Sequence, residues 1–307
     1  MKVVVTLGGN ALLRRGQPMT ACNQRENVRV AVMALRNVAL RHRLILGHGN
    51  GPQVGLIALQ NDAYAHQVPA YPFDILGAES QAMVGYMFAQ EMRNALGEGT
   101  VVSLVTQSVV DPEDPAFSNP TKFIGPVYTE EQALALEKEK GWVMKADGQY
   151  RRRVVPSPLP RRIVEIEAIR RLVDAGVTVI AGGGGGVPVV EKDGKLQGLE
   201  AVIDKDYCSS LMARELNADR LIIATDVKGV FTGWGTPEQK LIRSASPETL
   251  LEMGFAAGSM GPKVLAACEF ARATGRRAVI GALEEIEGMV EGMAGTQIQS
   301  DLELAYY

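Results

Sequence analysis

The chain has 307 residues, 46% hydrophobic side chains and a formal net charge of −3. That length suits one large α/β domain or two lobes with a substantial core. The near-balanced charge argues against sequence-independent nucleic-acid binding, which needs a basic surplus. The three cysteines are scattered without a C-x-x-C pair, so neither a zinc knuckle nor a disulfide framework is indicated.

No membrane or export signal is recognised either. The apolar run at residues 1–5 ends at Gly8-Gly9, too soon for a signal peptide. No apolar run reaches the roughly 18 residues that a spanning helix needs. With its thiols reduced, the protein is expected in the cytoplasm.

The first third of the chain alternates short apolar strands with amphipathic helices. Residues 3–7 and 44–47 predict buried strands, each followed by a glycine-rich turn. The helix between them is expected to begin at Asn23, because Asn23 and Glu26 form a capping-box pattern. Further helices are expected from Pro52 to about His66 and over 80–96, with a strand over 100–105.

Residues 111–160 differ from the rest in their seven prolines. One short helix, capped by Thr129 with Gln132, interrupts this stretch. The run Arg151-Arg152-Arg153 is interpreted as a solvated face. We therefore expect an insertion that stands off the main sheet.

Regular alternation resumes with a helix over 163–173 and a strand over 177–181. This strand runs into five glycines, 182–186. Glycines there weaken the strand and lose more chain entropy on folding, which suggests a ligand against the backbone. Later elements are a hairpin at Asp193-Gly194, a helix from Asp204 to about Leu216, a strand over 220–224, a helix from Gly258 to Thr274, and strands over 278–280 and 295–298.

This alternation predicts a mainly parallel sheet covered on both faces. Ligands of such folds lie at the carboxyl ends of the strands. Four glycine turns are expected at that edge: 8–9, 49–51, 182–186 and 258–261. Together they indicate a phosphate-rich ligand.

The two commonest phosphate motifs are excluded. A P-loop fails because Gly261 is followed by Pro262 before Lys263, and no G-x-G-x-x-G fingerprint occurs at residues 49–54 or 182–187. The remaining candidates for binding phosphate are lysines that lie beside glycine turns. Lys263 would lie in the first turn of a helix, where backbone N–H groups also attract anions. Lys205, between Asp204 and Asp206, could be an ordinary surface ion pair or could neutralise a phosphoryl group in transfer.

Seven sequence segments form a recognisable set: LGGNAL (7–12), HGNGPQVG (48–55), DPAF with PTK and IGP (114–126), RRVVPSP (152–158), GGGG (182–185), EAVIDKD (200–206) and GSMGPK (258–263). With these segments the chain resembles, over essentially its whole length, the carbamate kinases of the amino acid kinase superfamily. The blocks at 48–55 and 114–126 are the more specific to carbamate kinases, and those carrying Asp206 and Lys263 fit the superfamily.

The resemblance implies an open three-layer αβα sandwich and a homodimer. It also implies reversible phosphoryl transfer between ATP and carbamate with Mg²⁺, which the nucleotide phosphates would hold without protein side chains. An acceptor lobe over 1–217, including the protrusion at about 111–160, would precede a nucleotide lobe over 218–307. Because carbamoyl phosphate is a mixed anhydride, the direction of ATP synthesis is favoured. The pathway served, such as arginine or purine catabolism, stays open.

The resemblance also assigns residues to the site. Lys205 and Lys263 would bracket the migrating phosphoryl group, Asp206 would organise them, and Lys122 would reach in from the insertion. The acceptor and phosphate side is expected to comprise Gly8, Gly9, Asn10, Gly49, Asn50, Gly51, Gly182, Gly183 and Gly184. The nucleotide side is expected to comprise Thr225, Asp226, Val230, Gly258, Ser259 and Met260.

Relatives that act on larger acids often carry a lysine where this chain has Thr6, so Lys122 is the natural replacement for that charge. A carbamate oxygen is already anionic, so no general base is required and His48 is expected to be structural. Two alternatives remain: a kinase of the same superfamily for another small acid, and a regulator that does not turn over. Retention of all four charged residues argues against the regulator.

Overall fold

The computed structural model describes residues 1–14, 16–255 and 260–307. Its centre is a ten-stranded sheet in the order β13-β14-β16-β15-β12-β1-β2-β9-β3, with β17 paired to β14. The six strands from β15 to β3 run parallel, and antiparallel pairs occur at the β13 end. The strands are β1 (Lys2–Leu7), β2 (Arg43–His48), β3 (Val101–Ser103), β9 (Thr178–Ile180), β12 (Arg220–Thr225), β13 (Phe231–Thr232), β14 (Lys240–Ala245), β15 (Arg277–Ala282), β16 (Thr296–Ile298) and β17 (Ala305–Tyr306).

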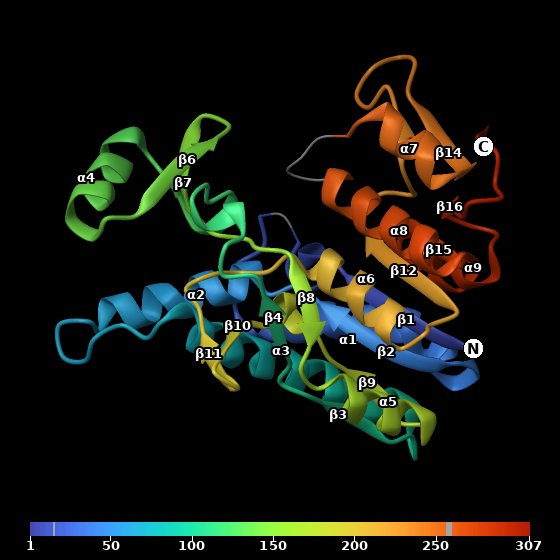
Figure 1. The fold of residues 1–307 in the computed structure, drawn as a ribbon, viewed down its shortest axis with the longest axis horizontal. Helices are drawn as coiled ribbons and strands as arrows, with labels where there is room; N and C mark the ends of the chain where they lie inside the picture. The colour runs from blue at the N-terminus through green and yellow to red at the C-terminus, as the bar shows by residue number, and fades with distance from the viewer. Residues whose placement is uncertain (15, 256–259) are drawn as a thin grey trace.

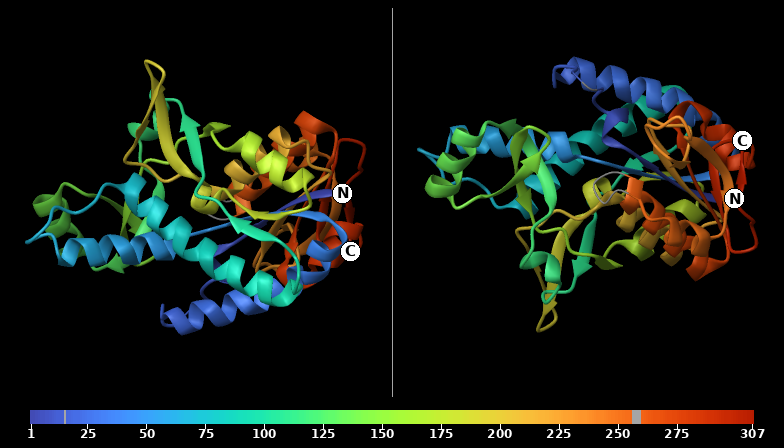
Figure 2. Two further views of the ribbon diagram at one scale, coloured as in Figure 1. Left: turned by 90° about the horizontal axis from the view of Figure 1, so that it is seen from below. Right: turned by 90° about the horizontal axis from the view of Figure 1, so that it is seen from above.

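Helices cover both faces of this sheet (Figures 1 and 2). One face packs against α1 (Ala21–Arg41), α3 (Phe73–Leu96) and α9 (Ile286–Glu291), and the other against α5 (Ile166–Asp174), α6 (Lys205–Glu215) and α8 (Met260–Thr274). Both faces are covered because apolar side chains alternate along the strands. In β1, Val3 and Val5 pack in the core on the α1 side, and Val4 packs in the core on the α6 side. Each such side chain contributes about 1.5–3 kcal/mol by full burial. The expected mainly parallel, doubly covered sheet is confirmed.

A smaller sheet protrudes from this body, at the upper left of Figure 1. It consists of β5 (Lys122–Tyr128), β7 (Tyr150–Val155) and β6 (Val143–Asp147), all antiparallel, with α4 (Glu130–Lys140) across it. We call residues 122–155 the protruding subdomain. The capping box of Thr129 and Gln132 at α4 is present as expected.

A four-stranded sheet and several short elements complete the described fold. The four strands are β4 (Gln107–Val110), β8 (Pro160–Ile163), β10 (Val187–Lys192) and β11 (Lys195–Gly198), with the expected hairpin at Asp193-Gly194. The other elements are α2 (Gly51–Ala63), α7 (Pro247–Met253) and the 3₁₀ turns η1 (Gly9–Ala11), η2 (Pro115–Phe117), η3 (Gly183–Gly185) and η4 (Leu283–Glu285). No helix in the described ranges is long and apolar enough to cross a membrane.

Some expected boundaries were wrong. Helix α1 begins at Ala21 because the Thr20 hydroxyl caps it, accepting from the Asn23 N–H at 3.2 Å, while the Asn23 side chain bonds back to Pro18. Helix α2 ends at Ala63, earlier than expected. Ile163 belongs to strand β8, and helix α5 starts only at Ile166.

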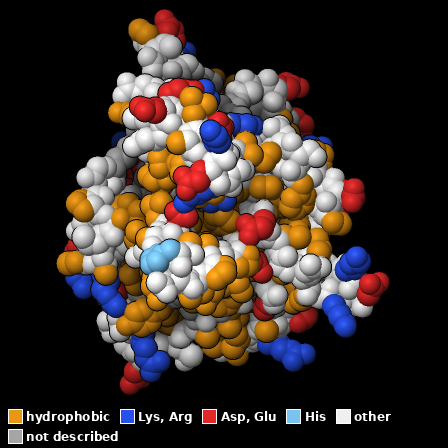
Figure 3. All heavy atoms as spheres, turned by 90° about the vertical axis from the view of Figure 1, so that its left-hand side faces the viewer, with side chains coloured by type: hydrophobic (Ala, Val, Ile, Leu, Met, Phe, Trp, Pro, Cys, Tyr) orange, Lys and Arg blue, Asp and Glu red, His pale blue; other side chains and the backbone are white. Residues whose placement is uncertain are grey.

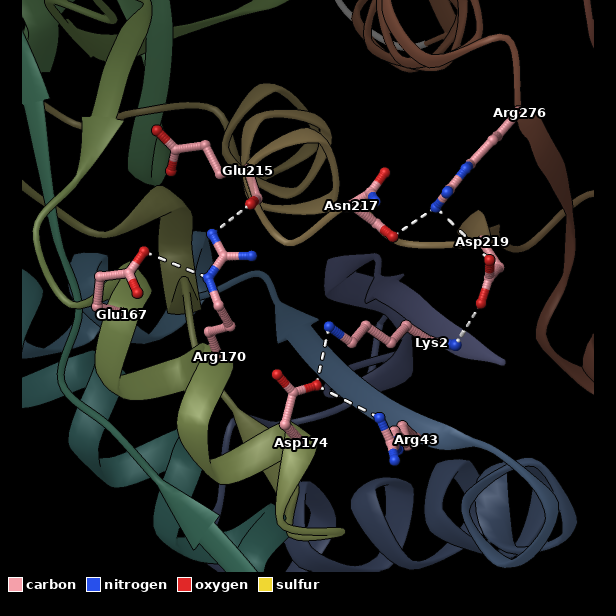
Figure 4. Close-up of polar contacts among 9 residues, drawn as sticks. All are labelled: Lys2, Arg43, Glu167, Arg170, Asp174, Glu215, Asn217, Asp219 and Arg276. Carbon is pink, nitrogen blue, oxygen red and sulfur yellow. Dashed lines mark hydrogen bonds and ion pairs between the residues drawn. The ribbon is translucent and has the colours of Figure 1, made fainter.

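Ion pairs lie at the amino ends of the strands β1, β2 and β12 (Figure 4). The Asp174 carboxylate accepts from Lys2 of β1 at 2.9 Å and from Arg43 of β2 at 3.3 Å. Asp219, just before β12, accepts from the Lys2 backbone at 2.8 Å and pairs with Arg276 at 3.5 Å. At this edge the cations Lys2, Arg43 and Arg276 are therefore paired with two carboxylates.

Candidate active site

The carboxyl ends of β1, β2 and β12 open into a cleft with a volume of about 410 Å³. Three helices begin at this cleft: α2 at Gly51, α6 at Lys205, and α8, whose Pro262 and Lys263 line it. A helix N-terminus carries partial positive charge and exposed N–H groups. The cleft is therefore suited to a ligand with several anionic oxygens.

Two lysines meet at one buried carboxylate inside the cleft. The Lys205 ammonium donates to Asp206 Oδ1 at 2.6 Å, and the Lys263 ammonium donates to Oδ2 of the same residue at 3.1 Å. Asp206 is only 2% exposed, so these contacts hold both ammonium groups in place. The expected shared cleft of Lys205 and Lys263 is present.

The electrostatic balance differs between these two lysines. Burial lowers the pKa of Lys205, although Asp206 opposes the shift. Burial would also lower the pKa of Lys263, but Asp206 outweighs it and the pKa is raised. The two ammonium groups also repel each other, which a phosphoryl group between them would relieve.

A third lysine enters from the protruding subdomain. Lys122, at the start of β5, donates to Asp204 Oδ2 at 2.6 Å, while Asp204 Oδ1 caps α6 by accepting from the Asp206 N–H at 2.9 Å. Burial would raise the pKa of Asp204, but Lys122 and Lys205 outweigh it and hold the pKa well below its usual range. Asp204 stays ionised and ties the subdomain to the helix that carries Lys205 and Asp206.

The five-glycine turn after β9 is dictated mainly by packing against protein. Gly182, Gly184, Gly185 and Gly186 all have φ between 62° and 91°. A Cβ on Gly184 would overlap the Asn50 carboxamide, and one on Gly185 would lie 2.5 Å from the Ile203 carbonyl oxygen. Of this turn, Gly184 is the member found among the described residues that line the cleft.

The structure brings most of the expected site residues together. The cleft is lined by Gly8, Gly9, Gly49, Asn50, Gly51, Lys122, Gly184, Lys205, Asp206, Thr225, Asp226 and Lys263. Asn10 contributes backbone to η1.

Other expected site residues are not in the cleft lining. Gly182 and Gly183 pack beneath it, against Cys208 and His48, and Val230 is fully buried. Met260 begins α8, just before the lining residues Pro262 and Lys263. Gly258 and Ser259 lie outside the described residues. The fourth glycine turn does not follow a strand as expected, because α7 precedes it.

His48 lies below the cleft as a packing residue, in keeping with the structural role expected of it. Its ring stacks on Phe88 at 5.8 Å between centroids, and its Nδ1 lies 3.0 Å from the Gly49 carbonyl oxygen. Burial lowers the pKa of His48 to about 4, partly offset by the Gly49 carbonyl. The imidazole is therefore neutral at physiological pH.

Sequence reasoning missed two acidic residues in the cleft lining. Asp204 was expected to open a helix and to flank Lys205, but its bond to Lys122 across the cleft was not anticipated. The second is Glu284, an exposed side chain that lines the cleft. No sequence pattern marks Glu284, because its place depends on how β15 ends beside β12.

The cleft lacks a dedicated metal cage as far as the structure is described. Residues 1–14, 16–255 and 260–307 contain no group of three or more His, Cys, Asp or Glu side chains able to hold an ion. Asp206 is occupied by two lysines. These residues fit a metal that arrives bound to nucleotide phosphates.

Comparisons with known proteins agree with this geometry. The model of the amino acid kinase family matches residues 1–282. The chain is 55% identical over 310 residues to the carbamate kinase of Haemophilus influenzae, covering 100% of both chains. It is 55% identical to that of Rhizobium meliloti, covering 98% of this chain and 94% of the relative.

A solved structure shares the whole fold. Carbamate kinase from Giardia lamblia bound to AMP-PNP superposes with a TM-score of 0.90 at 41% identity, covering 98% of each chain. The three-layer αβα arrangement expected from the sequence is thus confirmed. The chain belongs to the amino acid kinase family, as a phosphotransferase whose full-length relatives are carbamate kinases.

Proposed function

We propose that the protein transfers a phosphoryl group reversibly between ATP and carbamate, giving ADP and carbamoyl phosphate. The observation that carries this proposal is the convergence of Lys122, Lys205 and Lys263 on one cleft, held by two carboxylates. Phosphoryl transfer requires mainly alignment of the reactants and neutralisation of the equatorial oxygens. Three fixed ammonium groups provide that neutralisation without solvent rearrangement.

In the ATP-forming direction, an ADP β-phosphate oxygen attacks the phosphorus of carbamoyl phosphate. The new O–P bond forms as the bond to the carbamate oxygen breaks, and carbamate leaves as an anion. Neither the formation of the new bond nor the breaking of the old one needs a proton from the protein. This agrees with His48, which is buried and neutral and lies away from the cleft lining.

The two sides of the cleft receive the two substrates in this proposal. The glycine turns after β1 and β2, with Asn50 and Gly184, would bind the acceptor and its phosphate. Thr225, Asp226, Val230 and Met260 would form the nucleotide side, together with Gly258 and Ser259, which lie outside the described residues. The division into lobes at 217/218 belongs to the same proposal. Mg²⁺ held on the nucleotide phosphates would, when ATP is the donor, withdraw charge from the oxygen that leaves with ADP.

Location and assembly are further parts of the proposal. Three unpaired cysteines suit the reducing cytoplasm.

A homodimer is supported by apolar side chains gathered on one face of the molecule (Figure 3). In and beside the connection from α2 to α3, Leu59, Tyr64, Val68, Tyr71 and Ile75 are each between 37% and 58% exposed. Light scattering on the purified protein tests this assembly.

The decisive experiment measures ATP formed from ADP and carbamoyl phosphate by the purified protein. Activity that Lys205→Met abolishes is the expected result, with carbamate preferred over N-acetylglutamate and UMP in the reverse direction. If the protein prefers another acceptor, that acceptor and not carbamate is its substrate. Tight nucleotide binding without turnover would instead indicate a regulator.

A further inference from the structure

The run Arg151-Arg152-Arg153 on β7 does not form the uniform solvated face expected from the sequence. Arg151 pairs with Glu130 of α4, inside the protruding subdomain, at 2.6 Å. Arg153 instead points at two aromatic rings, with its guanidinium carbon 4.2 Å from the Trp142 ring centre and 4.8 Å from that of Phe73. Within the described part of the chain no hydrogen bond or ion pair of the Arg153 guanidinium is found.

The two rings belong to different parts of the molecule. Trp142 precedes β6 in the protruding subdomain, whereas Phe73 is the first residue of α3 in the body and only 4% exposed. Arg153 is half-buried between them. An arginine over an aromatic face is attracted by the ring electrons, the more so when it is desolvated. Arg153 therefore links the subdomain to the body.

Apolar and backbone contacts surround this link. A small separate core joins Ile124 and Val155 of the subdomain to Val54, Phe73, Leu76 and Val202 of the body. Nearby, a Cβ on Gly55 of α2 would lie 2.7 Å from the Cα of Gly125 in β5. The α2 and β5 backbones thus meet without a side chain between them, which leaves little room for β5 to shift.

Strand pairing transmits the position of Arg153 to the cleft. Arg153 of β7 pairs with Ile124 of β5, and two residues along, Val155 pairs with Lys122. Arg153 does not line the cleft itself, as far as the cleft is described. Its effect on the reaction would therefore pass through β5 and Lys122.

We propose that Arg153 is a positioning residue. Its contacts with Phe73 and Trp142 hold the protruding subdomain against the body, and this keeps Lys122 over the reacting phosphoryl group. This role rests on the proposed function. A misplacement of about 1 Å can cost about 100-fold in rate. The Arg153 contact is thus able to matter far more for turnover than for stability.

A double-mutant cycle tests the route through Lys122. Arg153→Ala should lower kcat/KM for ATP formation at least about tenfold in the wild-type background, but less than about twofold in a Lys122→Ala background. Arg151→Ala, from the same strand and arginine run, should stay within about twofold of wild type. An equal loss with and without Lys122, or no loss in either, would overturn the proposal.

Fluorescence tests docking independently of turnover. The chain has two tryptophans, so Trp234→Phe leaves Trp142 as the reporter. Arg153→Ala in that background should shift Trp142 emission to longer wavelength, whereas Arg151→Ala should not. An unchanged spectrum would show that Arg153 does not seat the subdomain.

Two further outcomes are covered. If Arg153→Ala does not fold, Phe73→Leu can replace it, because leucine keeps the apolar contact but removes the aromatic ring that Arg153 contacts. This variant is then combined with Lys122→Ala in the same double-mutant cycle, and the same changes in kcat/KM are expected. If the wild-type protein makes no ATP, the proposed function fails and the positioning role with it, while the Trp142 spectra still decide whether Arg153 docks the subdomain.

Discussion

Lys122 and Asp204 are 82 residues apart in sequence, yet their side chains meet at 2.6 Å across the mouth of the cleft. One residue belongs to the protruding subdomain and the other caps α6. Their contact brings a third ammonium group to the two lysines that share Asp206. The charges proposed for phosphoryl transfer are therefore assembled from two parts of the molecule.

Lys122→Ala should reduce kcat for ATP formation by about 100- to 1,000-fold, the usual effect of removing one donor that stabilises transition-state charge. The unfolding free energy should change by less than about 1 kcal/mol, because Lys122 is 33% exposed and its ion pair is partly screened. Steady-state kinetics and urea unfolding measure the two effects. Lys145→Ala is the matched control, since Lys145 lies in the same subdomain and bonds only to Asn119 among the contacts described. Unchanged turnover in Lys122→Ala would refute a catalytic role.

Asp206→Asn should cost both stability and turnover. It leaves two clustered ammonium groups without their shared counter-charge, and breaking a buried ion pair typically costs about 3–5 kcal/mol. Glu269→Gln provides the comparison, because the Glu269–Arg214 pair spans 2.9 Å but is partly exposed and should contribute less than about 1 kcal/mol. Denaturant unfolding of both variants checks this ranking. Equal losses would contradict the buried organising role of Asp206.

His48 should make stability depend on pH in mildly acidic solution. Its pKa is about 4 in the fold and about 6.5 unfolded, so between these values the unfolded chain binds the extra proton. Stability is therefore full above about pH 6.5 and falls as pH drops toward 4, by up to about 3 kcal/mol. His48→Gln should flatten this slope, whereas His66→Gln, at an exposed site, should not. Unfolding curves across this pH range measure it, and an unchanged slope in His48→Gln would assign the effect elsewhere.

Gly184→Ala should disrupt the acceptor side more than backbone strain alone explains. Gly184 and Gly194 have φ of 62° and 71°, so alanine costs roughly 1–2 kcal/mol at either position from backbone conformation. At Gly194 the space is open, but at Gly184 the new methyl group would collide with Asn50. Gly194→Ala should therefore keep activity, while Gly184→Ala loses more stability and raises KM for carbamoyl phosphate. Similar kinetics in the two variants would argue against Asn50 as an acceptor ligand.

Sequence reasoning succeeded where the determinants are local. The strand end at residue 7, the cap at Thr129 and the hairpin at Asp193-Gly194 each depend on a few neighbouring residues. The motifs also predicted that Lys205, Asp206 and Lys263 share one cleft, although α6 follows β11 of the smaller sheet and α8 follows α7, not strands of the parallel run.

It failed where a residue's role depends on distant partners. Arg153 looks like its neighbour Arg151 in sequence and differs only because Phe73 lies opposite it in the fold. Asp204 gains its second role only when β5 brings Lys122 over α6. The glycine turn at 182–186 was attributed to a ligand, but Asn50 and Ile203 occupy most of the space that side chains would need. None of these contacts leaves a periodic signal.

The ion pairs around Asp174 and Asp219 lie at the amino ends of the strands whose carboxyl ends form the cleft (Figure 4). The ion-paired residues and the cleft are thereby separated by the length of a strand. A substitution at Asp174 or Asp219 can therefore change these ion pairs without touching a residue found in the cleft lining as described.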